Sequence, residues 1–299
     1  MTLASCDSRK TAGENPFFTE WDTSHGVPPF DKILPEHFMP AFERGMSLHE
    51  AEIDAITSNK DEATFENTIL AYDDAGQMLA QTELVFGMLC AAETNDRMQA
   101  LQEQAMPLLA AHRDKIRLDD KLFVRVKEVY DRRAALGLDA EQMRLLQKTY
   151  DSFVRAGALL DAEQKARLKE INGQLSLTAV KFGNNILAEN NNFVLELKSD
   201  ELDGLPAGIR DAAREKAQQM GKGDKWVFTL HKPSLIPLLT YSTRRDLREK
   251  IYKAYLNRCN NGDEYDNKQL INDFIRLRTE KAHLLGYPSY AAYVVDDEM

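Results

Sequence analysis

The sequence predicts a mainly α fold, a multi-helix array that carries a small β insertion. Apolar residues recur at helical spacing through most of the chain, as Leu168, Ile171 and Leu175 illustrate. Alternation of apolar and polar residues, the pattern of a half-buried strand, is confined to short segments near residues 193–197 and 226–230. No repeat of fixed period runs through the sequence, which argues against a solenoid.

The beginning of the chain differs from the helical body that follows it. Residues 15–40 are rich in proline and aromatic residues, and we expect their rings to pack on a scaffold without long regular structure. A helical pattern follows over residues 65–89, interrupted only by Gly76. A second apolar stripe covers residues 98–116, where Pro107 predicts a kink or a break.

Three aspartates indicate where later helices begin. Asp119, Asp139 and Asp161 each stand just before a new periodic run, as helix N-cap residues do. Asp161 and Gln164 have the spacing of a capping box, in which two side chains satisfy backbone N–H groups reciprocally. The helix that begins there could extend to Glu189.

The pattern changes after residue 190, where the two strand segments flank a short helix over residues 207–220. Two further helices are expected over residues 243–258 and 266–285. The sequence thus divides into a leader remnant or tether (1–14), a helical amino-terminal domain (15–190), a small α/β insertion (191–240) and a second helical segment (241–299).

The last helical pattern is short. Gly286 supplies the left-handed residue that closes the preceding helix, and Ser289 opens a new one with Tyr290 and Tyr293 on one face. We interpret these two tyrosines, together with Tyr287, as packing residues first and substrate contacts second. No capping signal follows before the sequence stops, so we expect it to stop inside a helix that it has just begun.

Composition and charge narrow the class of protein. Hydrophobic residues make up 43% and charged residues 29% of the chain, a globular balance. The net charge of −10 argues against a nucleic-acid partner, because such binders need a basic face. No apolar run approaches the roughly 20 residues of a membrane-spanning helix, so we expect the body of the protein not to be membrane-inserted.

The three cysteines, Cys6, Cys90 and Cys259, form no CxxC motif and no sign of a disulfide framework. Cys90 lies on an apolar helical face and is interpreted as a buried, inert thiol. Cys6 ends the stretch "LASC", which resembles a bacterial lipobox, and a polar tether follows it. The charged start and apolar stretch of a signal peptide are missing before Leu3, so this chain as written would not be exported or lipidated. For the parent protein we expect lipidation at Cys6 and a periplasm-facing lipoprotein of the bacterial envelope, with the cytoplasm as the alternative.

No catalytic or metal-binding residue is predicted in this chain. A HExxH zinc site needs two histidines four residues apart on one helix face, and no two of the six histidines have that spacing. His49 and Glu50 begin "HEAEI", but Ile53 stands where the second ligand should be, so His49 is interpreted as an exposed helix residue. GxSxG and phosphate-binding loops are also missing from the sequence.

Several long blocks resemble a known family. They are "NPFFTEW", "PPFDKILPEHFMPAFERGM", "LDGLPAGIRDAA", "WVFTLHKPSLIPLLTYSTRRDLREKIYKAYLNR" and "YDNKQLINDFIRLRTEKAHLLGYPSYAAY". In order and content they resemble the amino-terminal half of the thimet oligopeptidase family of zinc metallopeptidases, and within it the peptidyl-dipeptidases, or dipeptidyl carboxypeptidases.

The resemblance implies that this chain forms one wall of a deep peptidase cleft and that residues 241–299 lead into a missing carboxy-terminal catalytic half. In the family that half holds zinc through HExxH and a further Glu, and no position here matches those residues. The resemblance therefore implies zinc in the full-length enzyme, none bound by this fragment, and no peptide cleavage by the fragment alone.

The implied activity of the whole enzyme is removal of carboxy-terminal dipeptides from oligopeptide substrates. "ENPFFTEW" and "DGLPAGI" look more like that branch than like the internally cleaving oligopeptidases, which are the alternative. A different class of function is a stand-alone helical module that binds peptides without cutting them.

Overall fold

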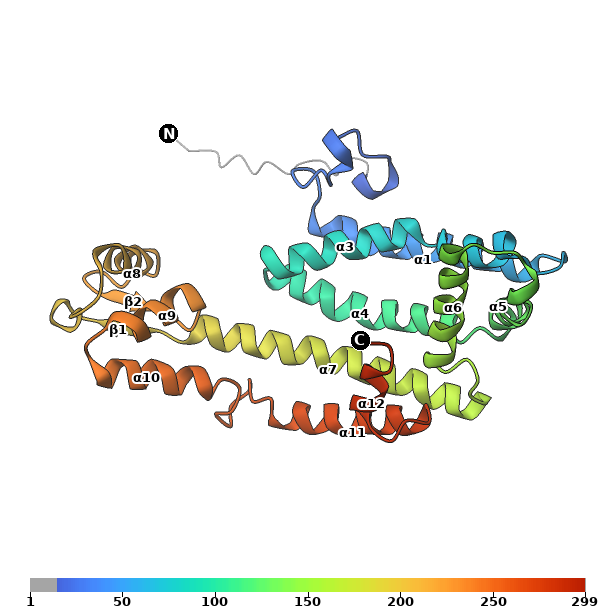
Figure 1. The fold of residues 1–299 in the computed structure, drawn as a ribbon. Coiled ribbons are helices and arrows are strands. Elements are labelled where there is room, and N and C mark those ends of the chain that lie inside the picture. Colours follow the sequence, from blue (N-terminus) through green and yellow to red (C-terminus); the bar gives the residue numbers. More distant parts are fainter. Residues whose placement is uncertain (1–14, 299) are drawn as a thin grey trace. The chain divides into compact units, whose positions relative to one another are not determined.

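The computed structural model describes residues 15–298 and confirms the mainly α prediction (Figure 1). The described chain divides into two compact units. The first unit comprises residues 15–177 and 278–298, and the second comprises residues 178–277. This division follows contacts, whereas the sequence-based boundaries at 190 and 240 follow composition and stay a prediction.

The first unit is built from helices only. Its helices are α1 (Phe38–Ser58), α2 (Ala71–Asp73), α3 (Gln77–Ala92), α4 (Asp96–Arg117), α5 (Asp120–Asp131), α6 (Ala140–Arg155) and α12 (Tyr290–Val295). Two longer helices, α7 (Ala162–Asn192) and α11 (Lys268–Leu284), contribute residues to both units. Short turns of 3₁₀-helix occur at Pro16–Phe18, Ser24–Gly26, Pro35–His37 and Arg133–Ala135, and a π-helix at Phe65–Leu70.

The predicted N-caps are confirmed. The side chains of Asp119 and Asp139 accept hydrogen bonds from the backbone N–H three residues later, at 2.8 and 2.9 Å. Asp161 and Gln164 form the expected reciprocal pair, with bonds of 2.8 and 3.2 Å. These side chains satisfy N–H groups that the first helical turn leaves without a partner.

Apolar clusters hold the amino-terminal helices of this unit together. In one cluster Phe38 and Phe42 of α1 pack on Phe86 of α3, with ring centroids 4.9 and 5.2 Å apart. In another, Phe123 of α5 lies 6.1 Å from Phe153 of α6, which is fully buried. Burial of such side chains provides the main stabilisation of the helical array.

The sequence predicted interruptions of the helices at Pro107 and Gly76, and the structure shows an interruption only at Gly76. Pro107 does not break α4, which continues from Asp96 to Arg117 with the proline inside it. Gly76, treated in the sequence as a minor interruption, separates α2 from α3 with a left-handed φ of 77°. A side chain at Gly76 would meet the ring of His49 at about 3.0 Å, which explains why glycine fits this turn.

The second unit contains the predicted β insertion. Strand β1 (Leu195–Leu197) pairs antiparallel with β2 (Trp226–Phe228), and Glu196 lies opposite Val227. Both strands are shorter than the segments expected from alternation. Helix α8 (Ala207–Gln219) confirms the helix predicted between the strands, and it packs against β2.

Two more helices, α9 (Lys232–Tyr241) and α10 (Arg245–Leu256), follow β2 in the second unit. No helix was predicted over the residues of α9, which include Pro233 and Pro237. Pro233 occupies the first turn of α9, where its missing N–H has no helical partner to lose.

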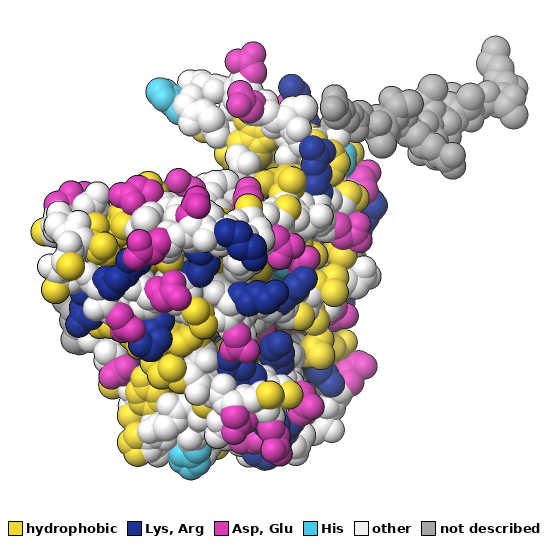
Figure 2. All heavy atoms as spheres, turned by 90° about the vertical axis from the view of Figure 1, so that its right-hand side faces the viewer, with side chains coloured by type: hydrophobic (Ala, Val, Ile, Leu, Met, Phe, Trp, Pro, Cys, Tyr) yellow, Lys and Arg dark blue, Asp and Glu magenta, His cyan; other side chains and the backbone are white. Residues whose placement is uncertain are grey.

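Charges on the molecular surface are mixed. On the face shown in Figure 2, acidic and basic side chains are interspersed, with no large area of one sign. Among the described residues, ion pairs such as Lys127–Asp131 and Arg132–Glu62 bring opposite charges together. Within residues 15–298, no helix combines the length and apolar character needed to cross a bilayer.

Candidate functional site

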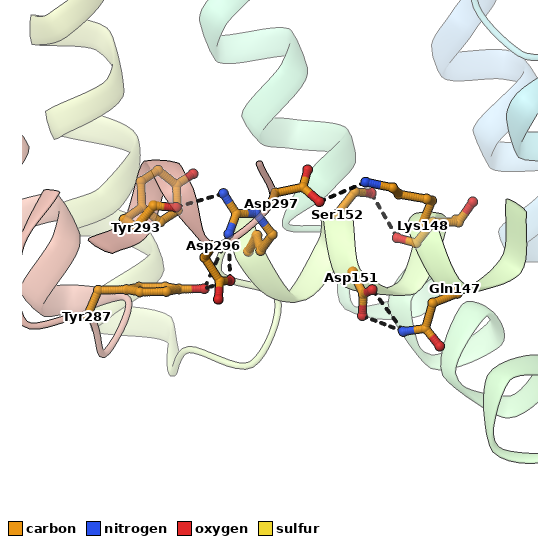
Figure 3. A network of polar contacts seen from close by, with 10 residues as sticks. Gln147, Lys148, Asp151, Ser152, Tyr287, Tyr293, Asp296 and Asp297 are labelled. Atoms are coloured by element: carbon orange, nitrogen blue, oxygen red, sulfur yellow. Dashed lines mark hydrogen bonds and ion pairs between the residues drawn. The ribbon is translucent and has the colours of Figure 1, made fainter. Parts of the chain in front are cut away.

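A network of polar side chains joins residues 287–297 to helix α6 within the first unit (Figure 3). Helix α11 ends before Gly286, whose φ of 84° turns the chain. The Ser289 hydroxyl then accepts a hydrogen bond of 3.1 Å from the N–H of Ala292 and begins α12. This turn places the rings of Tyr287 and Tyr293 edge to face, 5.3 Å apart.

Arg155, the last residue of α6, is the centre of this junction. Its Nη1 donates to Asp296 Oδ2 at 2.7 Å, and its Nη2 donates to the carbonyl of Tyr293 at 2.8 Å. Its guanidinium also lies over the Tyr293 ring, 4.8 Å from the centroid. The Tyr287 hydroxyl donates to the same carboxylate oxygen of Asp296 at 2.8 Å (Figure 3). One arginine therefore holds a carboxylate, a carbonyl and a ring of the α12 segment.

Burial and the contacts within the junction shift the pKa values of Tyr287, Tyr293 and Arg155. Burial raises the pKa of Tyr287, and its hydrogen bond to Asp296 raises it further. Burial also raises the pKa of Tyr293. Burial opposes the charge on Arg155, but Tyr287, Tyr293 and Asp296 more than offset it, so the pKa of Arg155 is raised. At neutral pH the junction therefore contains a charged arginine and two protonated tyrosines.

A second ion pair lies beside the first. Lys148, seven residues before Arg155 in α6, donates to Asp297 Oδ1 at 2.8 Å (Figure 3). Both side chains are about half exposed, at 44% and 50%. A pair this exposed contributes little to stability, so Arg155 carries the main contact.

Inner polar contacts fix α11 to the same unit. Lys281 donates to Asn172 Oδ1 at 2.7 Å, and the Asn172 amide donates to Asp114 at 2.8 Å. Burial lowers the pKa of Lys281 and raises that of Asp114. Arg167 forms two hydrogen bonds with the carboxylate of Glu280, at 2.6 and 2.9 Å. The charged groups that contact α11 are thus arranged to position the helix.

This arrangement can position a segment. Arg155 and Tyr287 both donate to the Asp296 carboxylate, and Arg155 also donates to the Tyr293 carbonyl. The junction therefore acts as an anchor for the α11–α12 segment.

The sequence-predicted site residues have different outcomes. Cys6 lies outside the described residues. Cys90 is half-buried, not fully buried, and desolvation raises the pKa of its thiol to about 11, so it is protonated at neutral pH. The three tyrosines pack together as predicted: Tyr290 lies 5.8 Å from Tyr293, and Tyr287 contacts Tyr293 as described above.

The interpretation of His49 as an exposed helix residue is wrong. His49 is half-buried, and its Nδ1 lies 3.0 Å from Nε2 of the buried His112. Glu50 lies 3.5 Å from the other nitrogen of His112 and pairs with Lys115 at 2.8 Å. Desolvation lowers the pKa of both histidines. The contact joins α1 to α4 across 63 residues of sequence, a distance over which local spacing gives no signal.

Among residues 15–298, no group of three or more His, Cys, Asp or Glu side chains is placed to hold a metal ion. The two histidines that meet, His49 and His112, are hydrogen-bonded to each other, which leaves the facing nitrogens engaged. The prediction that this chain binds no zinc is left for experiment.

Sequence reasoning missed Arg155 and its partners. Asp296 is 141 positions from Arg155, and the Lys148–Asp297 pair spans 149. An arginine at the carboxy-terminal end of a helix reads as a favourable charge near the helix dipole, and acidic residues after a short helix read as solvated. Only the fold brings them together.

The fold and the site together define a helical scaffold. This scaffold holds the α12 segment in place through Arg155. Comparison with known proteins specifies that class further. The model of peptidase family M3 matches residues 238–299, which include the segment anchored by Arg155. The chain is 36% identical over 286 residues to dipeptidyl carboxypeptidase of Escherichia coli (strain K12), covering 95% of this chain and 42% of that protein.

Relatives of lower sequence identity are also named as oligopeptidases. Oligopeptidase A of Escherichia coli (strain K12) is 26% identical over 93% of this chain and 41% of its own length. Thimet-like oligopeptidase of Dictyostelium discoideum is 24% identical over 86% of this chain and 37% of its own length. The chain is therefore related to the M3 peptidases, as its sequence blocks predicted, and it spans about two fifths of the length of these relatives.

Proposed function

We propose that this chain is the amino-terminal, cleft-wall portion of a zinc-dependent peptidyl-dipeptidase, which removes carboxy-terminal dipeptides from oligopeptides. The observation that carries the proposal is the identity of 36% with dipeptidyl carboxypeptidase, against 26% with oligopeptidase A, over nearly the same residues. The zinc ligands and the general base would lie in polypeptide outside these 299 residues. The fragment alone would be inactive.

The junction at Arg155 gives the proposal a structural role for this chain. The M3 family model begins at residue 238, and the contacts of Arg155, Arg167 and Asn172 attach the last part of that region to the amino-terminal helices of the first unit. In the whole enzyme, these contacts would keep the wall in register with the catalytic polypeptide.

An oligopeptidase that cleaves internal bonds is the alternative within the family. The test is product analysis with the full-length protein, using an amino-terminally blocked hexapeptide with a free carboxyl end and the same peptide as its carboxy-terminal amide. A peptidyl-dipeptidase should release dipeptides stepwise from the free acid only. Internal fragments from both substrates would favour the oligopeptidase.

A stand-alone peptide-binding module is the alternative of a different class. Calorimetry of the 299-residue chain with unstructured oligopeptides separates the two. Half of a cleft should bind them weakly or not at all, because the opposite wall that would exclude water is missing. Micromolar binding without cleavage would favour the binding module.

For location, we propose that Cys6 of the parent protein is acylated and that the enzyme faces the periplasm. The support is the lipobox-like "LASC" and the polar stretch after it. Mass analysis of the amino-terminal peptide from the native host tests this, with Cys6→Ser as the control. An unmodified Cys6 would leave the cytoplasmic alternative.

A further inference from the structure

Exposed apolar side chains are concentrated in the region that the peptidase family model matches. Among the described residues, eighteen large apolar side chains are exposed, and seven of them lie in residues 238–299, about a fifth of the chain. They are Tyr241, Tyr252, Leu256, Ile271, Ile275, Val294 and Val295. Single exposed apolar residues are ordinary on a protein surface, whereas a concentration of them indicates a surface that another element covers.

Helix α11 carries a well-defined part of this surface within the second unit. Ile271 and Ile275, which are 46% and 61% exposed, are four residues apart and therefore share one face of the helix. Phe274, by contrast, contacts α7, where its ring centroid lies 6.0 Å from that of Phe182. The side of α11 that packs on α7 is thus occupied, whereas Ile271 and Ile275, the isoleucine stripe, are left uncovered.

Isoleucine is not favoured at exposed positions of a helix. Its β-branched side chain is restricted at χ1, so its helix propensity is lower than that of lysine, glutamate or leucine. Two exposed isoleucines in successive turns therefore bring no stability to this chain alone. Their side chains are suited to a contact that removes them from water.

The isoleucine stripe lies next to the part of α11 that α12 contacts. Arg278 follows Ile275 by three residues on the same helix, and its guanidinium lies over the Tyr290 ring of α12, 5.1 Å from the centroid. Seven residues of helix, about 10 Å, separate Ile271 from Arg278. Polypeptide that continues after α12 can therefore reach the stripe within a few residues, since an extended chain spans about 3.3 Å per residue.

We propose that the isoleucine stripe of α11 is the docking surface for the polypeptide that follows these 299 residues in the parent protein. An apolar helix face of that polypeptide covers Ile271 and Ile275, because side chains four residues apart form a ridge that fits the groove of another helix. The inference rests on the proposed function, which assigns the catalytic residues to polypeptide outside this chain. The chain covers 42% and 41% of two relatives, so a polypeptide larger than the chain itself is available to dock.

Cysteine labelling measures whether the stripe is covered. Ile275→Cys is introduced into the 299-residue chain and into the full-length parent, and peptide mapping reads its alkylation separately from that of the native cysteines. Alkylation should be at least about tenfold slower in the full-length protein, because a covered thiol is inaccessible. Leu84→Cys, at a position of α3 that is 69% exposed, is the control and should react equally in both proteins. Equal alkylation of Ile275→Cys in both proteins would overturn the proposal.

The same measurement separates other occupants and other failures. Protection that rises with the concentration of the 299-residue chain alone would assign the stripe to a second copy and contradict the proposal. Protection in a full-length protein that releases no dipeptides would support the docking surface and contradict only the proposed function. Rapid alkylation in a full-length protein that does release dipeptides would contradict only the docking surface.

Two introduced charges give an independent readout. Ile271→Lys combined with Ile275→Lys should leave the helical circular dichroism and the urea midpoint of the 299-residue chain unchanged, because lysine is the better helix former. In the full-length protein the same pair should lower the urea midpoint, since the charges would be buried in an apolar contact. Leu84→Lys with Met88→Lys, an exposed pair of the same spacing on α3, is the matched control and should change neither protein. A full-length protein whose midpoint tolerates the α11 pair would contradict the proposal.

Discussion

The amino-terminal helices and the α12 segment belong to the same compact unit but are held in different ways. Helices α1, α3, α5 and α6 bury whole aromatic side chains, among them Phe38, Phe42 and Phe153, each at most 1% exposed. Helix α12 buries no residue fully and is attached through Arg155 and Lys148. The body of the unit therefore depends on apolar packing, whereas the α12 segment depends more on a few polar contacts, and we expect it to open separately.

The largest loss of stability is expected from a substitution in the apolar core of the amino-terminal helices. Phe153 is fully buried, with its ring 5.2 Å from Tyr72. Phe153→Ala should lower the free energy of unfolding by about 3–5 kcal/mol, because it removes buried surface and leaves a cavity. Urea denaturation measures this loss, and Phe153→Leu should recover part of it. A loss below about 1 kcal/mol would show that α6 does not depend on this packing.

Arg155→Ala tests the polar contacts that attach the α12 segment. It removes the contacts with Asp296 and Tyr293, and the expected loss is smaller, about 1–2 kcal/mol, because the carboxylate is half exposed. Hydrogen exchange should rise in residues 290–298 and stay unchanged in α1 and α3. Arg155→Lys should restore only part of the protection, since lysine cannot hold the carboxylate and the carbonyl in one fork. Unchanged exchange in α12 would contradict the role of Arg155.

The histidine pair predicts a pH dependence. Desolvation lowers the pKa of His49 and His112 below the ordinary value of 6.5, so the unfolded chain takes up protons first as the pH falls. Stability should therefore be constant above about pH 6.5 and decline as the pH falls toward the lowered values. The charged groups that act on the pair are Glu50 and Glu52 of α1, Glu83 of α3 and Lys115 of α4.

Urea midpoints at pH 7.5 and 5.5 measure this decline. His49→Gln combined with His112→Gln should flatten it, because neither side chain then titrates. The lowered pKa of Glu50, caused by Lys115, adds a similar decline only near and below its ordinary value of 4.5. A slope between pH 7.5 and 5.5 that persists in the double variant would assign the dependence to other groups.

The smallest effect is expected at Lys148. Both members of its pair with Asp297 are exposed, and such pairs contribute little. Lys148→Ala should leave the urea midpoint unchanged and raise hydrogen exchange in α12 less than Arg155→Ala does. A larger effect than that of Arg155→Ala would reverse the assignment of the main anchor.

Local features of the fold were predictable from the sequence, and long-range ones were not. The caps at Asp119 and Asp139 depend on neighbours three residues away, so spacing was sufficient to find them. Helix α9 was not predicted; it contains Pro233 in its first turn, where a proline loses no helical hydrogen bond, and Pro237 further along.

In the candidate site, too, contacts between residues far apart in the sequence could not be predicted. Tyr287, Tyr290 and Tyr293 lie three residues apart in the sequence and were expected to pack, as the rings of Tyr287 and Tyr293 do. Arg155 was not identified, since nothing local links it to Asp296. Similarly, His49 was interpreted as exposed because its partner, His112, lies on another helix. Tertiary contacts decide such residues.

The most direct measurement of whether these residues form a scaffold without a catalytic centre is metal content together with dipeptide release. The purified 299-residue chain should be equilibrated with zinc, freed of excess metal, and assayed on a blocked hexapeptide beside the full-length protein. We predict well below one bound zinc per chain and no dipeptide release from the fragment, with both present in the full-length protein. Stoichiometric zinc in the fragment, with dipeptide release that a chelator abolishes, would contradict this.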